Sequence, residues 1–262
     1  DTNAVISQIG NTPLVSLKQA SEITGCNIYG KAEYLNPGES VKDRAALFIV
    51  QDALKKKLIS KGGTIVEGSA GNTGIGLAIV CKQYDLKLKI VIPRTQSIEK
   101  KETLKNLGAE IIEVDAVPYT NPKNYIKQSK QIADDLNKKS SKGVYWANQF
   151  DNVINAEAHI QTTSEEIWNQ TAGSIDGFTC AVGTGGTLAG VSIGLKNKNK
   201  NIKIGLSDPM GSALYSHIKN NKLESSGSSI TEGIGNGRVT KNFDKALVDD
   251  AFQTDDVEAL NL

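Results

Sequence analysis

The sequence predicts an α/β protein of two lobes, each an open and mostly parallel sheet flanked by helices. Three observations predict this fold class. Apolar stretches typical of strands alternate with amphipathic stretches typical of helices along nearly the whole chain. A glycine-rich turn between a strand and a helix occurs in each half of the chain, at 67–76 and 181–190. The length of 262 residues suits two lobes or one large unit.

The elements of the first half follow from the residues that begin and end them. Pro93 ends a strand, Ser97 is a favourable helix cap, and Gly108 is a favourable helix stop. The expected order is a strand at 64–67, a helix from about Thr73, a strand in LKLKIVIPR, a helix at 97–108, a strand in EIIEVD and a helix from Pro122 to about Asn137.

The second half repeats this alternation, which favours parallel strands with helices on the sheet faces. The expected order is a helix from about Asn155 to Gln170, a strand in GFTCAVG, a helix from Thr187 to Leu195 and a strand in NIKIGLSD.

Composition excludes several classes of protein. Thirty lysines and arginines against 29 acidic residues give a formal net charge of +1, so charge indicates neither a nucleic-acid nor a membrane partner. The longest apolar run, near 74–81, is too short to span a bilayer. Cys26, Cys81 and Cys180 are scattered without a CxxC motif, which predicts no disulfide framework and no metal site. We expect a reducing compartment, cytoplasmic or mitochondrial.

The two ends and the two histidines carry further expectations. The first residue is Asp1 rather than methionine, so we expect that a segment, with any targeting signal, has been removed. Residues 254–260 are typical of a helix start, which predicts that the chain continues beyond Leu262. His159 and His217 are expected to be structural, because no second metal ligand lies at a suitable spacing.

The stretch NPGESVKDRAALF places Lys42 in the first turn of an expected helix. Ser40 is predicted to cap this helix, with Asp43 completing the capping pattern. A cation near the positive end of the helix dipole costs roughly 0.3–1 kcal/mol. Lys42 is therefore either a solvated surface charge or a group that is not a cation in the working protein.

The turn AVGTGGTLAG predicts an anion site, because glycines admit a ligand close to the backbone and N–H groups at a helix start favour negative charge. A dinucleotide is the competing interpretation: Gly183 and Gly185 fit that fingerprint and Asp208 ends the next strand, but Leu188 stands where the third glycine belongs. The residues at the centre of the turn are Gly183, Thr184, Gly185, Gly186 and Thr187.

The turn EGSAGNTGIG presents Ser69, Asn72 and Thr73, which could bind a carboxylate and donate to a phenolate-like oxygen. Simple capping of the next helix is the plainer interpretation. An anion cradle, a polar loop and an unfavourably placed lysine are together what pyridoxal phosphate requires, since its lysine is held as a neutral imine. This combination accounts for Lys42 and disfavours a dinucleotide.

Six segments in the same order resemble motifs of the fold-type-II pyridoxal-phosphate enzymes, specifically the cysteine synthase and cystathionine β-synthase group. The resemblance covers almost the whole chain and implies the fold of the tryptophan synthase β-subunit. The segments are IGNTPLVSL, NPGESVKDRAA, SAGNTGIGLA, NQFDNVINAEAHIQTTSEEIW, GTGGTLAG and TEGIGNG.

The resemblance implies a role for each candidate site residue. Lys42 would hold the cofactor as an imine and move the proton at the substrate Cα, and Asn72 would donate to the ring oxygen. The turn at 183–187 would hold the phosphate. The implied substrate-binding residues are Ser69, Gly71, Asn72, Thr73 and Gln149 for the α-carboxylate, with Gly233 on the far wall.

The implied activity is β-replacement, in which O-acetylserine or a related β-substituted alanine reacts with sulfide to give cysteine. Cystathionine β-synthase chemistry, serine or threonine dehydration, and a non-catalytic binding protein of this fold are the alternatives. The resemblance also implies a homodimer. It implies a large cofactor domain made of 1–34 and 147–262, and a smaller mobile substrate domain at 35–146.

Three departures from the family pattern bear on this reading. Ala70 stands where a serine is common, and Asn152-Val153-Ile154-Asn155 replaces an Asn-Pro-Ala-Asn stretch. The residue expected to face the pyridine nitrogen would lie beyond Leu262.

Overall fold

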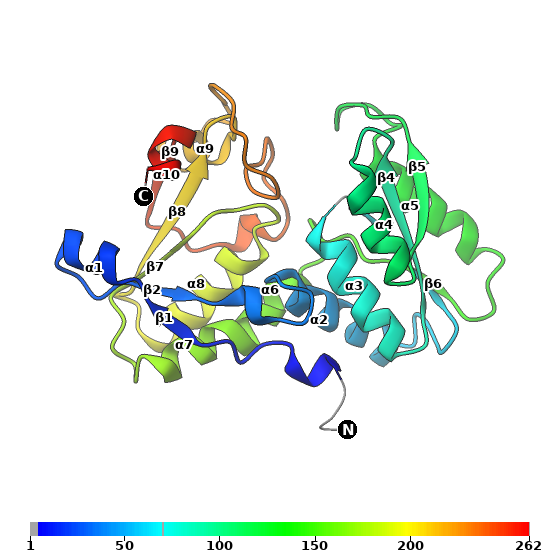
Figure 1. The fold of residues 1–262 in the computed structure, drawn as a ribbon, viewed down its shortest axis with the longest axis horizontal. Helices are drawn as coiled ribbons and strands as arrows, with labels where there is room; N and C mark the ends of the chain where they lie inside the picture. Colours follow the sequence, from blue (N-terminus) through cyan, green and yellow to red (C-terminus); the bar gives the residue numbers. More distant parts are fainter. Residues whose placement is uncertain (1–4, 70, 262) are drawn as a thin grey trace. The chain divides into compact units, whose positions relative to one another are not determined.

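The computed structural model describes residues 5–69 and 71–261, and the chain divides into two compact units, 1–149 and 150–262 (Figure 1). Both units contain parallel sheets flanked by helices, which confirms the predicted fold class. The assignment of 1–34 to the same domain as the second half of the chain stays a prediction.

The first unit is built on a four-stranded parallel sheet with the order β5-β4-β3-β6. Its strands are β3 (Thr64–Gly68), β4 (Lys87–Pro93), β5 (Glu110–Val114) and β6 (Val144–Trp146). The helices that connect them are α3 (Asn72–Gln83), α4 (Ile98–Asn106) and α5 (Tyr125–Asn137).

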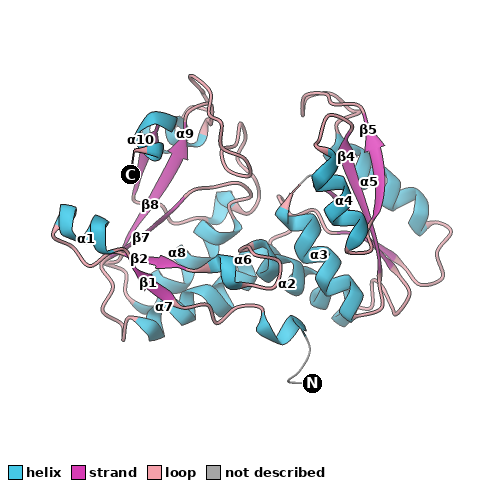
Figure 2. Cartoon of the chain, viewed as in Figure 1, coloured by secondary structure: helices cyan, strands magenta, loops and turns pink. Residues whose placement is uncertain are grey.

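The strand order creates a place where ligands can bind. The chain adds β4 and β5 on one side of β3 and then returns to add β6 on the other side. Because such crossovers are right-handed, α3 and α4 cover one face and α5 covers the opposite face (Figure 2). The C-terminal ends of β3 and β6 therefore flank a topological switch point, the position at which open α/β sheets bind ligands.

Apolar side chains fix the sheet in place. Val66, Val91 and Val114 project from three adjacent strands into one cluster with Ala133 of α5. Every residue of β3 is buried, as expected of a central parallel strand. Each fully buried aliphatic side chain contributes roughly 1.5–3 kcal/mol, so this core holds the end of β3 rigidly.

The N-terminal part of the first unit is tied to α2 (Lys42–Lys55) by a partly buried ion pair. The Arg44 guanidinium makes two 2.8 Å contacts with the Glu33 carboxylate, and the Thr12 hydroxyl donates to the same carboxylate at 2.6 Å. Such a bidentate pair fixes geometry as well as charge. The elements ahead of α2 are η1 (Val5–Gln8), β1 (Leu14–Ser16), α1 (Lys18–Thr24), β2 (Tyr29–Lys31) and η2 (Glu33–Leu35), with β1 and β2 antiparallel.

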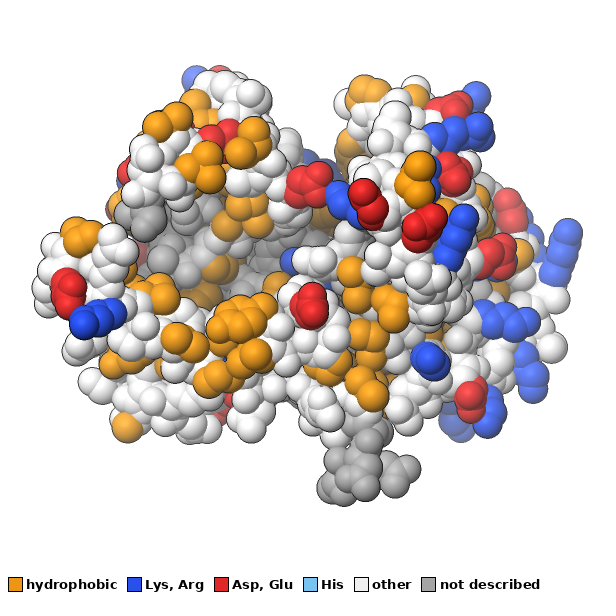
Figure 3. Space-filling view, in the orientation of Figure 1, with side chains coloured by type: hydrophobic (Ala, Val, Ile, Leu, Met, Phe, Trp, Pro, Cys, Tyr) orange, Lys and Arg blue, Asp and Glu red, His pale blue; other side chains and the backbone are white. Residues whose placement is uncertain are grey.

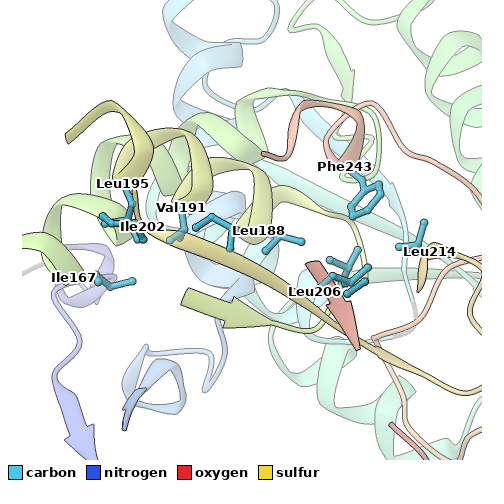
Figure 4. Close-up of a cluster of buried hydrophobic side chains, with 11 residues drawn as sticks. Ile167, Leu188, Val191, Leu195, Ile202, Leu206, Leu214 and Phe243 are labelled. Carbon is cyan, nitrogen blue, oxygen red and sulfur yellow. The ribbon is translucent and has the colours of Figure 1, made fainter. Parts of the chain in front are cut away.

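The second unit is built on a three-stranded parallel sheet with the order β7-β8-β9. Its core packs α8 against the sheet and α7, with Leu188, Leu195 and Leu206 among the fully buried side chains (Figure 4). The elements are α6 (Ile154–Ala158), η3 (His159–Thr163), α7 (Ser164–Gln170), β7 (Gly177–Cys180), α8 (Gly186–Lys198), β8 (Lys203–Pro209), α9 (Leu214–Asn220), η4 (Phe243–Lys245), β9 (Asp250–Thr254) and α10 (Asp256–Leu260).

The predicted element boundaries are close to the observed ones, with two informative differences. The helix predicted from Pro122 begins at Tyr125, because the Asn124 side chain accepts the N–H of Ile126 and so caps the helix there. The helix predicted over 155–170 contains a π-helical turn, η3, between α6 and α7. The predicted cap at Ser97 is confirmed, since its Oγ accepts the N–H of Lys100.

Acidic and basic side chains are interspersed over the region of β4, β5 and α4 (Figure 3). Mixed charge of this kind does not create a single-sign field for a polyanion. Within residues 5–69 and 71–261, no helix combines the length and apolar character needed to cross a bilayer.

Candidate active site

The loop after β3 lies at the switch point of the four-stranded sheet. Ser69 is buried, and its hydroxyl accepts the N–H of Gly71, the residue that precedes α3. Asn72 is the exposed first residue of α3, and Thr73 is the buried second one. The loop therefore gathers hydroxyl, amide and helix-start N–H groups, all of which can bind a carboxylate. Ala70 lies outside the described residues.

Gln149 joins this loop from the other side of the switch point. It follows β6, and its Oε1 accepts the hydroxyl of Thr73 at 2.5 Å, with both side chains buried. Residues that are 76 positions apart in the sequence thus meet because β3 and β6 are adjacent parallel strands. The structure brings together the predicted carboxylate-binding residues of the first unit.

Lys42 lies in the first turn of α2, as predicted, and is its first residue, but the cap of this helix differs from the prediction. Val41 occupies the cap position without a side-chain hydrogen bond, while the Ser40 hydroxyl accepts the N–H of Lys42 at 3.3 Å. Asp43 does not complete a capping box, because its Oδ2 accepts the N–H of Gly38 at 2.5 Å. The serine therefore forms a local turn just before the helix instead of capping it.

The starts of α2 and α3 approach each other closely, because Gly76 has no side chain. A Cβ on Gly76 would lie 2.9 Å from Oδ1 of Asp43 and 3.1 Å from its Cα. Burial raises the pKa of the Asp43 carboxyl to about 6. This close approach places the first turn of α2, which carries Lys42, beside the first turns of α3, which carry Asn72 and Thr73.

The loop at 183–187 has the features of a phosphate cradle. Gly185 precedes α8 with a φ of 86°, a conformation that glycine adopts at little cost. A Cβ on Gly186 would lie 2.1 Å from Oδ1 of Asn155, so a side chain here would force Asn155 to move. The Asn155 amide donates to the Thr184 hydroxyl at 3.0 Å. A rigid glycine loop that opens a 13-residue helix suits an anion such as a phosphate.

Gly233 lies against the same loop. A Cβ on Gly183 would come within 2.2 Å of the Gly233 carbonyl oxygen. The Asn236 amide donates to the Gly183 carbonyl at 2.9 Å, and the N–H of Gly235 donates to the Val182 carbonyl at 2.7 Å. The segment 233–236 therefore packs against this loop. The substrate-binding role that the resemblance implies for Gly233 stays a prediction.

His159 has a connection that the sequence interpretation missed. Its buried ring contacts the Thr163 hydroxyl through Nδ1 at 2.8 Å and the Thr187 hydroxyl through Nε2 at 3.2 Å. The available signal was spacing, since Asn155 and His159 are four residues apart and thus share a helix face. Through this face, Asn155 contacts Thr184 and His159 contacts Thr187, the two threonines of the glycine loop. His159 therefore supports the loop in addition to packing in the core.

Asp208 is engaged in a local structural role. Its Oδ2 accepts the N–H of Tyr215 at 2.7 Å at the start of α9, and burial raises the pKa of this carboxyl. A dinucleotide would need a free acid at the end of β8, but Asp208 there binds the start of α9. This agrees with the sequence, in which Leu188 stands where the third glycine of the dinucleotide motif belongs.

Comparison with known proteins places these features in context. A family model described as pyridoxal-phosphate dependent enzyme matches residues 5–262. The chain is 51% identical to Cysteine synthase 1 of Neurospora crassa, over 97% of this chain and 68% of the relative. It is 49% identical to Cysteine synthase 1 of Emericella nidulans, over 99% of this chain and 70% of the relative.

A solved structure of a related enzyme has the same fold as this chain. The crystal structure of a hydrogen sulfide-producing enzyme from Fusobacterium nucleatum matches with a TM-score of 0.82 and 36% sequence identity. The match covers 99% of this chain and 81% of that structure.

Proposed function

Because this chain belongs to the family of pyridoxal-phosphate dependent enzymes, we propose that it is a cysteine synthase that converts O-acetylserine and sulfide to cysteine and acetate. The observation that carries the proposal is the hydrogen bond between Thr73 and Gln149 at the switch point. It joins the loop after β3 to the segment after β6, which together would bind the substrate carboxylate. The high identity to relatives named cysteine synthase supports the choice of reaction.

Each unit contains candidate cofactor-binding residues. In the second unit, the 183–187 loop at the start of α8 would hold the phosphate through backbone N–H groups and the two threonine hydroxyls. In the first unit, Lys42 would hold the aldehyde carbon and Asn72 would donate to the ring oxygen. When bound, pyridoxal phosphate withdraws electrons from the substrate Cα and so acidifies its proton.

The residues of the first unit would bind and orient the amino acid. Ser69, Thr73 and Gln149 would receive the α-carboxylate, which fixes the Cα–H bond relative to the Lys42 amine. The amine, neutral once released, would take the Cα proton as acetate leaves Cβ. Sulfide would then form the new C–S bond at Cβ, and Lys42 would return the proton to Cα. One C–O bond breaks, one C–S bond forms, and the proton count balances.

Turnover assays separate this proposal from its alternatives. The purified protein should show a cofactor absorbance band that changes when O-acetylserine is added, and cysteine should form when sulfide follows. Faster turnover of serine with homocysteine than of O-acetylserine with sulfide would favour cystathionine β-synthase chemistry. Release of a keto acid without sulfide would favour dehydration. A protein that stays colourless with added pyridoxal phosphate would favour a non-catalytic role.

We also propose that the protein is a homodimer. Exposed apolar side chains project from the N-terminal segment of the first unit, a surface that is costly to leave in water. Figure 3 shows hydrophobic side chains gathered over the region of β1 and β2. The exposed apolar residues of the segment 14–35 include Val15, Leu17, Tyr29, Tyr34 and Leu35, each at least 40% exposed. Sedimentation velocity should give twice the chain mass for the wild type and a lower mass for Tyr34→Lys; a wild-type monomer would contradict the proposal.

A further inference from the structure

A buried acid lies directly behind the substrate loop. Glu67 is in β3, with its side chain 1% exposed, and it precedes Gly68 and Ser69. Its carboxyl accepts the backbone N–H groups of Asn148 and Gln149 and a side-chain N–H of Gln149. Its Oε2 has no hydrogen-bond partner among the described residues. A buried polar atom without a partner is costly, which points to a role for this acid beyond packing.

Glu67 controls the orientation of a neighbouring amide. The Gln149 side chain is held at both ends, because its oxygen accepts the Thr73 hydroxyl at 2.5 Å and its nitrogen donates to Glu67. Turning the amide by 180° would break both hydrogen bonds and place two donors or two acceptors face to face. The nitrogen is the end of the amide that can donate to an anion. The acid therefore fixes which end of Gln149 is available to a bound carboxylate.

We propose that Glu67 is a positioning residue for the carboxylate of the amino-acid substrate and that it acts through Gln149. This inference rests on the proposed function, which assigns the carboxylate to Ser69, Thr73 and Gln149. Burial raises the pKa of the Glu67 carboxyl to about 8, so near neutral pH the group is a neutral acid. A neutral acid needs only its carbonyl oxygen to accept N–H groups, and an amide offers the same oxygen.

Matched variants of the holoenzyme test this role. Glu67→Met has a similar length but no acceptor, whereas Glu67→Gln keeps a carbonyl acceptor. We expect Glu67→Met to raise KM for O-acetylserine by roughly tenfold, because one buried hydrogen bond is lost and the amide can turn. We expect kcat and KM for sulfide to change less than about twofold, as for a loss of uniform substrate binding. Glu67→Gln should keep KM within about threefold of wild type.

A double-mutant cycle then asks whether the acid acts through the amide. If it does, Glu67→Met combined with Gln149→Ala should have the same KM as Gln149→Ala alone. If the two substitutions raise KM independently, so that their fold-changes multiply in the double variant, the proposal is overturned. An active Gln149→Ala enzyme with wild-type KM would also overturn it. Glu67→Asp, whose carboxyl is one methylene short, replaces Glu67→Met if that variant fails to fold, with the same expected KM. Failure of the proposed function would look different, since the wild type itself would make no cysteine.

Discussion

The Nε2 atom of His159 lies 3.2 Å from the hydroxyl oxygen of Thr187, and the Nδ1 atom of the same ring lies 2.8 Å from the hydroxyl oxygen of Thr163. A neutral imidazole has one donor and one acceptor, so each ring nitrogen has a suitable hydroxyl partner. The ring is 1% exposed and belongs to η3, a π-helical turn of the kind often found at functional sites. His159 therefore orients the last hydroxyl of the glycine loop.

We expect His159→Asn to weaken pyridoxal phosphate binding by roughly five- to tenfold, because the shorter side chain cannot reach both hydroxyls and Thr187 loses its orientation. Equilibrium dialysis of the cofactor gives the dissociation constant directly. His217→Asn is the matched control, since that ring is half-buried on α9 and faces Phe243. Equal cofactor affinities for wild type and His159→Asn would contradict the assignment.

Lys42→Ala should lower cysteine formation by at least roughly a hundredfold, because no other amine at the start of α2 can carry the Cα proton. The absorbance band of the covalently held cofactor should also disappear. Lys56→Ala is the control, because this lysine caps the other end of the same helix and pairs with Asp52 at the surface. A yellow, active Lys42→Ala enzyme would refute the role of Lys42.

Much of the fold follows from sequence patterns because the elements have clear local boundaries. Pro93 ends β4, Ser97 caps α4, and the left-handed φ of 94° at Gly108 follows the end of α4. These signals act over three or four residues and do not depend on the rest of the chain. The start of α2 is harder to predict, since the hydrogen bond from Gly38 to Asp43 takes the acid away from Ser40.

The candidate site could be predicted only as two separate loops. The sequence indicates the residues at 69–73 and 183–187, because glycines and hydroxyl side chains cluster there. It does not indicate that Glu67 holds Gln149, or that His159 reaches Thr187, because these contacts depend on strand order and helix packing. Partners 28 residues apart or more carry no periodic signal.

Glu67→Gln should change how stability depends on pH. The pKa of Glu67 rises from 4.5 to about 8 on folding, because burial disfavours the ionised acid. An acid whose pKa rises on folding stabilises the folded state fully at pH values below its pKa in the unfolded chain. This stabilisation is lost as the pH rises through its pKa in the folded protein. Between about pH 5 and about pH 8, the wild-type free energy of unfolding should therefore fall by up to roughly 1.4 kcal/mol per pH unit from this group.

Urea denaturation at several pH values checks this expectation. Glu67→Gln cannot ionise, so its profile should lack this fall and cross above that of the wild type in alkaline solution. Tyr125, whose pKa is raised above 10 by burial and by Glu67, does not titrate in this range. Glu113→Gln is the control, because a hydrogen bond from Lys101 lowers the pKa of that acid. Parallel profiles for wild type and Glu67→Gln would show that Glu67 is ionised throughout.

Gly186→Ala should destabilise the second unit and weaken cofactor binding together. The new methyl group would lie 2.1 Å from Oδ1 of Asn155, and both residues are buried, so overpacking should cost roughly 1–3 kcal/mol. Moving Asn155 would also release its hydrogen bond to Thr184. Thermal unfolding and cofactor dialysis measure the two effects. At Gly237 a Cβ meets no described heavy atom within 4 Å, so Gly237→Ala should leave both unchanged. Equal losses in the two variants would mean that the contact with Asn155 does not limit position 186.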